Sequence, residues 1–566
     1  MKGTAWTVFS GTQPEPVPVE IIGLMKNAWG PKQDIIIAKM GGPAIRTNVA
    51  GGMSGSPVYI DGKLVGAVAL RLSVFSPDAI CGITPIELML EINDFDKSRP
   101  ADARNPDGPA VKRAGLNLPD SLAPYAGAGL RMSPIESPLV FSGFHEATLR
   151  EFAPLLAQAG IVPAQGGASS ALLSAKPVAG WEKSLLPGEA ISGVLVTGDM
   201  SMTVMGTVTY NDGKRVLAFG HPFLSLGPVA MPMAKSEVIM TLASSFQPNK
   251  FGNATEIVGS LKQDRHSGVM GVLGEQAAMI PCRLQVRTFA EDDSIQKHKD
   301  LNFQVFVQQK WTPFLMMVTL FNAIQGLNDF ADESTYRISG QVEMESGQKI
   351  SLSNMFAPTE APIPVPLVMA GWWGDKFNKL FLNTVQTPRL KSVNMTLDLL
   401  PQRRTASIHN AWIESAEVEP GSDVALKVFL RPYRGGAIEK NLNIHIPAGF
   451  PRGDHRILLS DGDTLNRMQS VAGLASRFMD LPETVSLINQ ERTNNKLYVS
   501  LVQARPTVYH EDKTMPSLPG SVANVMQNGR TSNRAFVTSS ETALEQQAIP
   551  FDLQITGSYS LRLKVK

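Results

Sequence analysis

The sequence predicts a mainly β protein of several domains, and three observations support this prediction. First, 48 glycines and 40 prolines among 566 residues favour many turns between short strands. Second, the pairs Asp61-Gly62 and Asp212-Gly213 each separate two apolar, β-branched segments, which is the pattern of a β-hairpin. Third, residues 401–566 contain long stretches in which apolar and polar residues alternate, as in half-buried strands.

Composition limits the classes of function. Hydrophobic residues make up 43% and charged residues 18% of the chain, so it can bury large cores. At roughly 150 residues per domain, the length corresponds to about three to four domains. Lysine plus arginine number 52 and aspartate plus glutamate 51, a balance that gives no electrostatic reason to expect nucleic acid or an anionic membrane as the main partner.

The two cysteines, Cys81 and Cys282, are too few for a zinc site or a dense disulfide framework. They form either one disulfide or, as is commoner, two separately buried thiols. No residue pattern indicates a metal or a cofactor, so we expect neither.

No segment is long enough to cross a bilayer as a helix. The longest apolar run, Pro313 to Ile324, is about half of the roughly 20 residues that a span needs. The N-terminal sequence MKGTAWTVFSG lacks a basic segment followed by an apolar one, so no signal peptide is visible. We therefore expect a soluble chain without a transmembrane segment; a truncated chain or a late start site are the alternatives.

Residues 1–92 read as short strands and turns. Asp34 to Met40 is an apolar strand, and Pro57 to Leu70 predicts strand, Asp-Gly turn and strand. A linker and helical insertion is expected at 93–175: it is Pro/Gly-rich over 93–135, has a helix near 145–159 that ends at Gly160, and continues with a flexible link, GGASSALLSA.

Three further segments are expected after this insertion. Residues 176–290 form a second strand-rich segment, and residues 291–400 form a mixed α/β segment with helices near 312–328 and 366–383 and strands near 334–353. Residues 401–566 form an all-β domain, for which an immunoglobulin-like sandwich is the natural form.

A glycine-rich turn around Ser54 is the sharpest local signal. Residues Gly51 to Pro57 read GGMSGSP, and glycine tolerates the positive φ angles of a tight turn. Such a turn can expose a serine hydroxyl while backbone N–H groups converge beside it; here the N–H groups of Gly52 and Ser54 would form an oxyanion hole. Ser54 is therefore the candidate catalytic nucleophile. The alternative is an ordinary Gly-Ser turn.

His221 is the candidate general base. A serine hydroxyl needs a base to take its proton, and histidine titrates near neutrality. None of the eight histidines lies within residues 1–144, and His221 follows the second hairpin in the segment AFGHP. The alternative is a histidine that caps a turn.

Together these segments resemble the SpoIVB peptidase family, the S55 domain. GMSGSP followed by a hairpin and GAV is similar to the family's serine segment, and the Gly-His segment at His221 is similar to its histidine segment. The resemblance covers roughly residues 1–290, interrupted at 93–175, and implies a permuted chymotrypsin-like double β-barrel with one half in 1–92 and the other in 176–290. It also implies a serine endopeptidase that acts on a protein or peptide substrate outside the cytoplasm, in the periplasm or cell envelope.

Two features differ from the family pattern. Ser54 precedes His221, whereas the family has histidine before serine; a permutation of the two barrel halves would preserve the geometry. The family's aspartate has no counterpart before the serine turn, since Asp34 is merely the nearest acid and Asp264 lies downstream of His221. The site would then be a Ser-His dyad, weak or inactive.

The sequence leaves two other classes of function open. One is a non-catalytic scaffold of the cell envelope that kept the barrel and lost the acid. The other is a carbohydrate- or peptide-binding β protein in which residues 401–566 carry the function.

Overall fold

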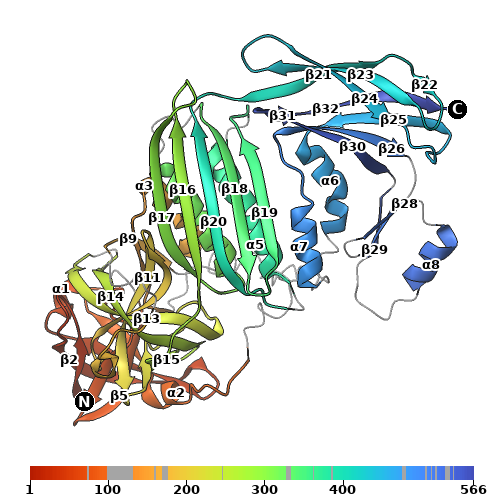
Figure 1. The fold of residues 1–566 in the computed structure, drawn as a ribbon. Coiled ribbons are helices and arrows are strands. Elements are labelled where there is room, and N and C mark those ends of the chain that lie inside the picture. The colour runs from red at the N-terminus through yellow and green to blue at the C-terminus, as the bar shows by residue number, and fades with distance from the viewer. Residues whose placement is uncertain are drawn as a thin grey trace, which may run out of the picture. The chain divides into compact units, whose positions relative to one another are not determined.

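The computed structural model describes the whole chain except residues 73–75, 99–131, 159–160, 168–175, 245–246, 327–332, 361–362, 384–385, 474–479, 504–506, 511–512, 517–518, 529–535 and 540. Most of the connection predicted at 93–135, the stop at Gly160 and most of the link predicted at 166–175 lie outside the described residues. The chain is mainly β (Figure 1). It divides into two compact units, Met1–Ile280 with Asn302–Trp311 and Pro281–Leu301 with Thr312–Lys566.

Six antiparallel strands close a β-barrel in the first unit. The pairing order is β4-β1-β2-β3-β6-β5, and β5 pairs again with β4. Small and β-branched side chains such as Ala5, Val19, Ala38 and Val68 fill its core, as the narrow interior of a small barrel requires. The strands are β1 (Lys2–Thr7), β2 (Glu15–Gly30), β3 (Gln33–Met40), β4 (Ser56–Ile60), β5 (Lys63–Arg71) and β6 (Ile80–Pro85), and β7 (Ser133–Pro134) is added beside β5.

The first predicted hairpin is confirmed. β4 and β5 are antiparallel, with Ile60 opposite Lys63. Asp61 and Gly62 between them have φ angles of +48° and +75°. A two-residue turn with two positive φ angles matches the right-handed twist of the strands, and Asp-Gly is among the pairs that adopt it most readily.

A second ring of antiparallel pairings follows in the same unit. Its order is β10-β13-β14-β15-β12-β11, and β11 pairs again with β10. The second predicted hairpin is confirmed as β11 and β12. The strands are β10 (Ala190–Gly198), β11 (Ser201–Asn211), β12 (Arg215–Ala218), β13 (Gly227–Leu242), β14 (Asn249–Arg265) and β15 (Gly268–Leu273). Strands β8 (Ser137–Ser142) and β9 (Ile161–Gln165) extend the sheet beyond β11; helix α3 (Glu146–Gln158) lies between them in the chain, and the short helix η4 (Trp181–Lys183) precedes β10.

Apolar side chains from the barrel and from the second ring pack against each other. Ala67 of β5 and Met89 of α2 (Ile86–Leu90) share a buried cluster with Leu217 of β12 and Met270 of β15. The two halves of the first unit, which are far apart in the sequence, therefore share one interface.

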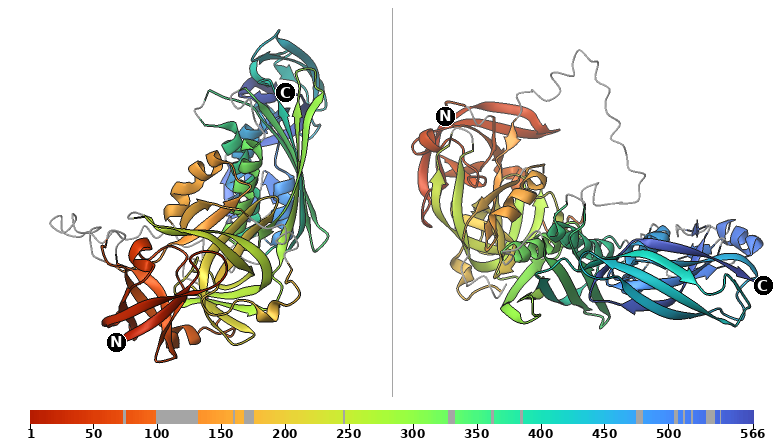
Figure 2. Two further views of the ribbon diagram at one scale, coloured as in Figure 1. Left: turned by 90° about the vertical axis from the view of Figure 1, so that its left-hand side faces the viewer. Right: turned by 90° about the horizontal axis from the view of Figure 1, so that it is seen from above.

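The second unit begins with strands in the order β19-β18-β20-β16. The predicted helices near 312–328 and 366–383 are confirmed as α4 and α5, which lie on one face of these strands (Figure 2). The buried Trp373 of α5 packs over Gly340 of β18. The elements are β16 (Met279–Phe289), α4 (Trp311–Gln325), β18 (Thr335–Met344), β19 (Lys349–Phe356), α5 (Val365–Phe381) and β20 (Leu390–Leu400). Strand β17 (Ile295–Phe306) is divided between the units after Leu301.

The main segment of the first unit ends at Ile280, ten residues before the domain boundary that we predicted after residue 290. Cys282 to Thr288 of β16 pair in parallel with Val393 to Leu399 of β20. A parallel partner so far along the chain cannot be recognised from local hydrophobic patterns. It is this pairing that assigns most of β16 to the second unit.

The C-terminal part contains two sheets around one shared core, β24-β23-β21-β31 and β22-β32-β25-β26-β30, and a separate three-stranded sheet, β28-β27-β29. The prediction that 401–566 is all-β is wrong, because three helices interrupt the strands: α6 (Gly462–Gly473), α7 (Leu481–Asn489) and α8 (Gly520–Asn528). The strands are β21 (Thr405–Ile413), β22 (Glu417–Val418), β23 (Asp423–Pro432), β24 (Ile438–His445), β25 (Gly453–Ser460), β26 (Lys496–Gln503), β27 (Thr507–His510), β28 (Lys513–Pro516), β29 (Phe536–Ser539), β30 (Thr542–Pro550), β31 (Gln554–Thr556) and β32 (Ser558–Val565).

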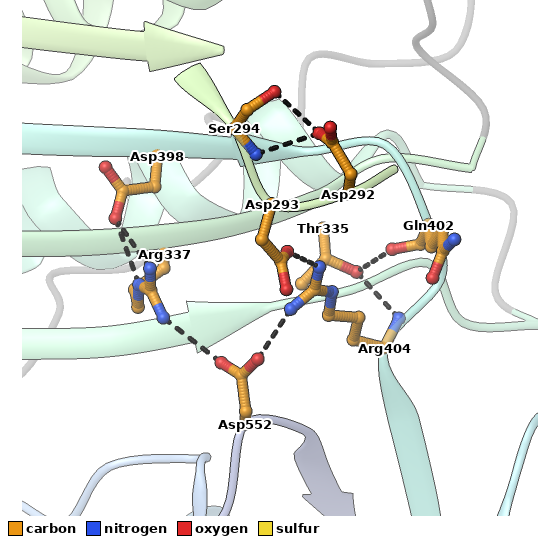
Figure 3. A network of polar contacts seen from close by, with 9 residues as sticks. All are labelled: Asp292, Asp293, Ser294, Thr335, Arg337, Asp398, Gln402, Arg404 and Asp552. Carbon is orange, nitrogen blue, oxygen red and sulfur yellow. Dashed lines mark hydrogen bonds and ion pairs between the residues drawn. The ribbon is translucent and has the colours of Figure 1, made fainter. Parts of the chain in front are cut away.

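An ion-pair network joins these sheets to the preceding strands of the same unit (Figure 3). Arg337 of β18 lies 3.0 Å from the buried Asp398 of β20 and 3.1 Å from Asp552. Arg404 reaches the other oxygen of Asp552 at 2.5 Å and also pairs with Asp293. The network fixes the loop that leads into β31. Among the described residues, no helix is long and apolar enough to cross a membrane.

Candidate active site

Ser54 lies in the turn between the short helix α1 (Ala44–Thr47) and strand β4. Gly52 and Gly55 on either side have φ angles of +85° and +97°. A Cβ atom at Gly55 would lie 1.9 Å from the carbonyl oxygen of Thr207. The glycines are therefore required both by the backbone conformation and by the close approach of β11.

The hydrogen bonds of this turn orient two backbone amides. The carbonyl of Gly51 accepts from Lys250 N at 2.9 Å, and the carbonyl of Met53 accepts from Ser56 N at 3.0 Å. In a trans peptide the N–H points away from its carbonyl, so the N–H groups of Gly52 and Ser54 point away from these partners. Neither N–H donates a hydrogen bond within the described part of the chain. They are two buried donors without an acceptor, as the predicted oxyanion hole requires.

His221 follows β12 through two residues of left-handed backbone, Phe219 at φ +69° and Gly220 at φ +68°. Its side chain is buried, and Nδ1 lies 2.8 Å from the carbonyl oxygen of Pro222. A carbonyl can only accept, so Nδ1 carries the hydrogen and Nε2 is left as an acceptor. Burial lowers the pKa of His221 to about 4, an effect that the bond to Pro222 opposes only in part. The imidazole is therefore neutral near pH 7, with the tautomer that a general base needs.

The serine and histidine segments meet at Thr207 of β11. Thr207 donates its N–H to the carbonyl of Ser54 at 2.8 Å and accepts from the N–H of Phe219 at 3.3 Å. A Cβ atom at Gly55 would lie 2.5 Å from that same Phe219 nitrogen. The two motifs, predicted separately from the sequence, thus lie against each other, with Ser54 next to Gly55 and His221 two residues after Phe219.

Ser54 and His221 do not hydrogen-bond to each other. Ser54 Oγ and His221 Nε2 are both buried and have no hydrogen-bond partner within the described residues. Ser54 has no exposed surface, whereas the sequence led us to expect an exposed hydroxyl. The reason is the packing of the turn against β11, which ties the carbonyls on both sides of Met53 to Thr207.

Neither candidate for the third catalytic group contacts His221 Nδ1. Asp264 is buried and accepts the N–H groups of Phe223 and Leu224 at 2.7 Å and of Leu226 at 3.1 Å. Burial raises its pKa, and these amide bonds act in the opposite direction. Asp264 therefore holds the loop that follows His221. Asp34 accepts from the backbone N–H of Asn27 in the exposed hairpin of β2 and β3.

Lys250, at the start of β14, escaped the sequence analysis. Its side chain has no exposed surface, and Nζ donates to Thr7 Oγ1 at 2.7 Å and to Thr207 Oγ1 at 3.3 Å. Burial alone lowers its pKa to about 7. No local pattern marks such a lysine, because its burial depends on strands from both ends of the first unit.

The two cysteines do not form a disulfide. Cys81 and Cys282 are each buried, as expected for two separate thiols. Within the described residues, no group of three or more His, Cys, Asp or Glu side chains could hold a metal ion.

No protein-family model matches the chain, and a search of curated proteins finds no relative.

Proposed function

We propose that this chain is a serine endopeptidase of the SpoIVB (S55) type, with Ser54 as nucleophile and His221 as general base. In this proposal, strands β1–β6 and strands β10–β15 are the two halves of a permuted chymotrypsin-like double barrel. The resemblance in sequence supports a protein or peptide substrate and a site of action in the cell envelope.

One observation carries the proposal. Four polar groups, Ser54 Oγ, His221 Nε2 and the N–H groups of Gly52 and Ser54, have no hydrogen-bond partner among the residues that the structure describes, and they lie in two adjoining buried turns. More than about 90% of buried polar groups in proteins are hydrogen-bonded, and each exception costs about 1–3 kcal/mol. A nucleophile, a base and two oxyanion donors are the groups that acyl transfer needs, and each must be free to engage the substrate.

The reaction would use these groups as follows. Ser54 Oγ attacks the scissile carbonyl carbon while His221 Nε2 accepts the hydroxyl proton, and the N–H groups of Gly52 and Ser54 stabilise the resulting oxyanion. The intermediate expels the amine, which takes the proton from Nε2, and leaves an acyl group on Ser54. Water then gives a proton to Nε2 and attacks the ester carbonyl carbon. The bond to Ser54 Oγ breaks, Oγ takes the proton back from Nε2, and the acid leaves. The carbonyl of Pro222 keeps the imidazole in the required tautomer.

Substrate binding must open the site in this proposal. Ser54 is fully buried, so the serine turn and the loop at His221 have to separate enough to admit a peptide. Catalytic hydrogen bonds often tighten only when substrate is bound. The chain is therefore proposed to rest in a closed, latent form.

Labelling with a fluorophosphonate probe tests the function. The proposal predicts stoichiometric labelling at Ser54, abolished by Ser54→Ala and weakened about 100-fold or more by His221→Ala. Ser137→Ala is the matched control, because Ser137 Oγ is also buried and without a partner but has no role in the proposed mechanism. It should leave labelling unchanged.

A second candidate function is a non-catalytic protein with a protease-like fold. The observation that favours it is the buried Ser54 hydroxyl, which does not bond to His221. Folded protein that stays unlabelled at all probe concentrations would support this candidate. In that case Ser54→Ala should stabilise the fold slightly, because it removes a buried hydroxyl that has no partner.

A further inference from the structure

Lys250 is a buried lysine that has no counter-charge among the described residues. Its ammonium donates to two hydroxyls there, those of Thr7 on β1 and Thr207 on β11, and burial is the cause of its lowered pKa. Lys376 in the second unit is also buried, but it pairs with Glu491. Burial of a charge without a counter-charge lowers the stability of the fold. The residues that Lys250 contacts indicate which function could offset this cost.

Lys250 contacts the serine turn directly through its backbone and methylene chain, and its ammonium reaches the turn through Thr207. Its backbone N–H donates to Gly51 O at 2.9 Å, and the methylene chain would lie 3.2 Å from a Cβ atom at Gly52. Its ammonium donates to Thr207 Oγ1, which in turn donates to Gly52 O at 2.8 Å. Lys250 therefore lies against the Gly51–Gly52 peptide unit, which carries the first of the two N–H groups.

We propose that Lys250 is a positioning residue of this site: it holds the oxyanion turn through Gly52 and Thr207, and its unpaired positive charge favours the negative charge that develops there. This inference rests on the proposed peptidase function. In the resting protein the charge of Lys250 has no partner, whereas the oxyanion would supply one. The interaction is thus stronger in the transition state than in the ground state, which is the condition for a gain in rate.

The inference has a consequence for pH. The elements packed against Lys250 present neutral groups to it: Thr7 on β1, Thr207 on β11, the serine turn, and Thr241, its pairing partner on β13. Its own proton therefore decides the local charge. As pH rises through about 7, Lys250 loses its proton and the site loses its cation. The rate of Ser54 acylation should therefore fall on the alkaline side, although His221 is neutral throughout this range.

The test measures fluorophosphonate labelling rates of the full chain between pH 5.5 and 9. Lys250→Met keeps the length of the side chain and removes the charge. It is expected to slow labelling about 10-fold or more at pH 6 and to abolish the alkaline fall. Lys262→Met is the matched control, because Lys262 lies on the same strand and pairs at the surface with Glu275. It should reproduce the wild-type curve, and a wild-type alkaline fall that persists in Lys250→Met overturns the proposal.

Hydrogen exchange of the peptide covering residues 48–56 gives a readout that needs no peptidase activity. Lys250→Met and Thr207→Val should each speed exchange in this turn about 10-fold or more, and Lys262→Met should not. If Lys250→Met does not fold, Thr207→Val, which removes the linking hydroxyl and keeps the branched shape, decides alone. Unchanged exchange overturns the positioning role. If the probe does not label the wild-type protein but exchange is faster in both variants, the peptidase proposal is refuted, whereas the role of Lys250 in holding the turn stands.

Discussion

Thr84 donates its hydroxyl hydrogen to the carbonyl oxygen of Gly220 at 2.7 Å, and both residues are buried. Thr84 lies on β6, which follows the serine hairpin, and Gly220 directly precedes His221. A Cβ atom at Gly220 would also lie 3.0 Å from the Cβ of Ala69 on β5. The barrel therefore holds the histidine segment by a hydrogen bond and by close packing, which makes the position of His221 depend on both halves of the first unit.

Replacing Thr84 with valine should destabilise the first unit by about 1–2 kcal/mol, because the Gly220 carbonyl would stay buried without its donor. Chemical unfolding, read by hydrogen exchange in peptides of residues 1–280, measures this change. Thr255→Val is the matched control, since Thr255 is only half-buried and its hydroxyl bond is longer, at 3.3 Å. We expect less than about 0.5 kcal/mol for the control. Equal losses of stability in the two variants would show that the bond to Gly220 contributes no more than an ordinary, partly exposed hydrogen bond.

Asp264→Ala should destabilise the first unit by about 3 kcal/mol or more. The carboxylate is buried and accepts three backbone N–H groups from the loop after His221, and alanine would leave them without an acceptor. Exchange of the amides in residues 222–227 should rise together with global exchange. If Asp264 were instead a catalytic acid, the substitution would reduce Ser54 labelling while leaving loop exchange unchanged.

Local patterns predicted much of this fold. The Asp61-Gly62 turn could be predicted because its two positive φ angles restrict it to a few residue types. The helices α4 and α5 could be predicted from long apolar stretches that exceed the length of a strand. Turns and helices are decided by neighbours in the chain, so a single sequence contains the information that they need.

The site could be predicted only in part. Gly52, Ser54 and His221 are conspicuous because glycine, serine and histidine stand in unusual backbone contexts. The burial of Ser54 depends on Thr207, which lies more than a hundred residues further along the chain. The contacts of Lys250 with Gly51 and Thr207 likewise join segments that are far apart in the sequence. Such contacts depend on how strands pair across the unit, which no local pattern records.

Helix α7 contains a signal that the sequence analysis overlooked. Asp480 accepts from the N–H of Glu483, and the Glu483 side chain accepts from the N–H of Asp480, which is a complete capping box. Asp480→Ala should cost about 1 kcal/mol in the stability of the second unit. Exchange in residues 481–489 measures this. Asp480→Ser, which can still accept the hydrogen bond, should recover most of the loss; failure to recover it would contradict the capping role.

His221 should make the stability of the first unit depend on pH in a defined window. Its pKa is about 4 in the folded protein and near 6.5 when unfolded, so between these values the unfolded state binds the extra proton. The free energy of unfolding should therefore fall as pH decreases from about 6.5 to 4, by about 1.4 kcal/mol per pH unit from this residue.

Substitution isolates this contribution. His221→Asn keeps a donor for the Pro222 carbonyl and removes the titration. Between pH 6.5 and 4.5 the free energy of unfolding of the variant should therefore decrease by about 2–3 kcal/mol less than that of the wild type. Unfolding at several pH values, read by exchange in peptides of residues 1–280, provides the comparison, and His145→Asn, at an exposed position, should follow the wild-type curve. Parallel curves for wild type and His221→Asn would mean that His221 is accessible to water in solution, and the closed form of the site would then have to be abandoned.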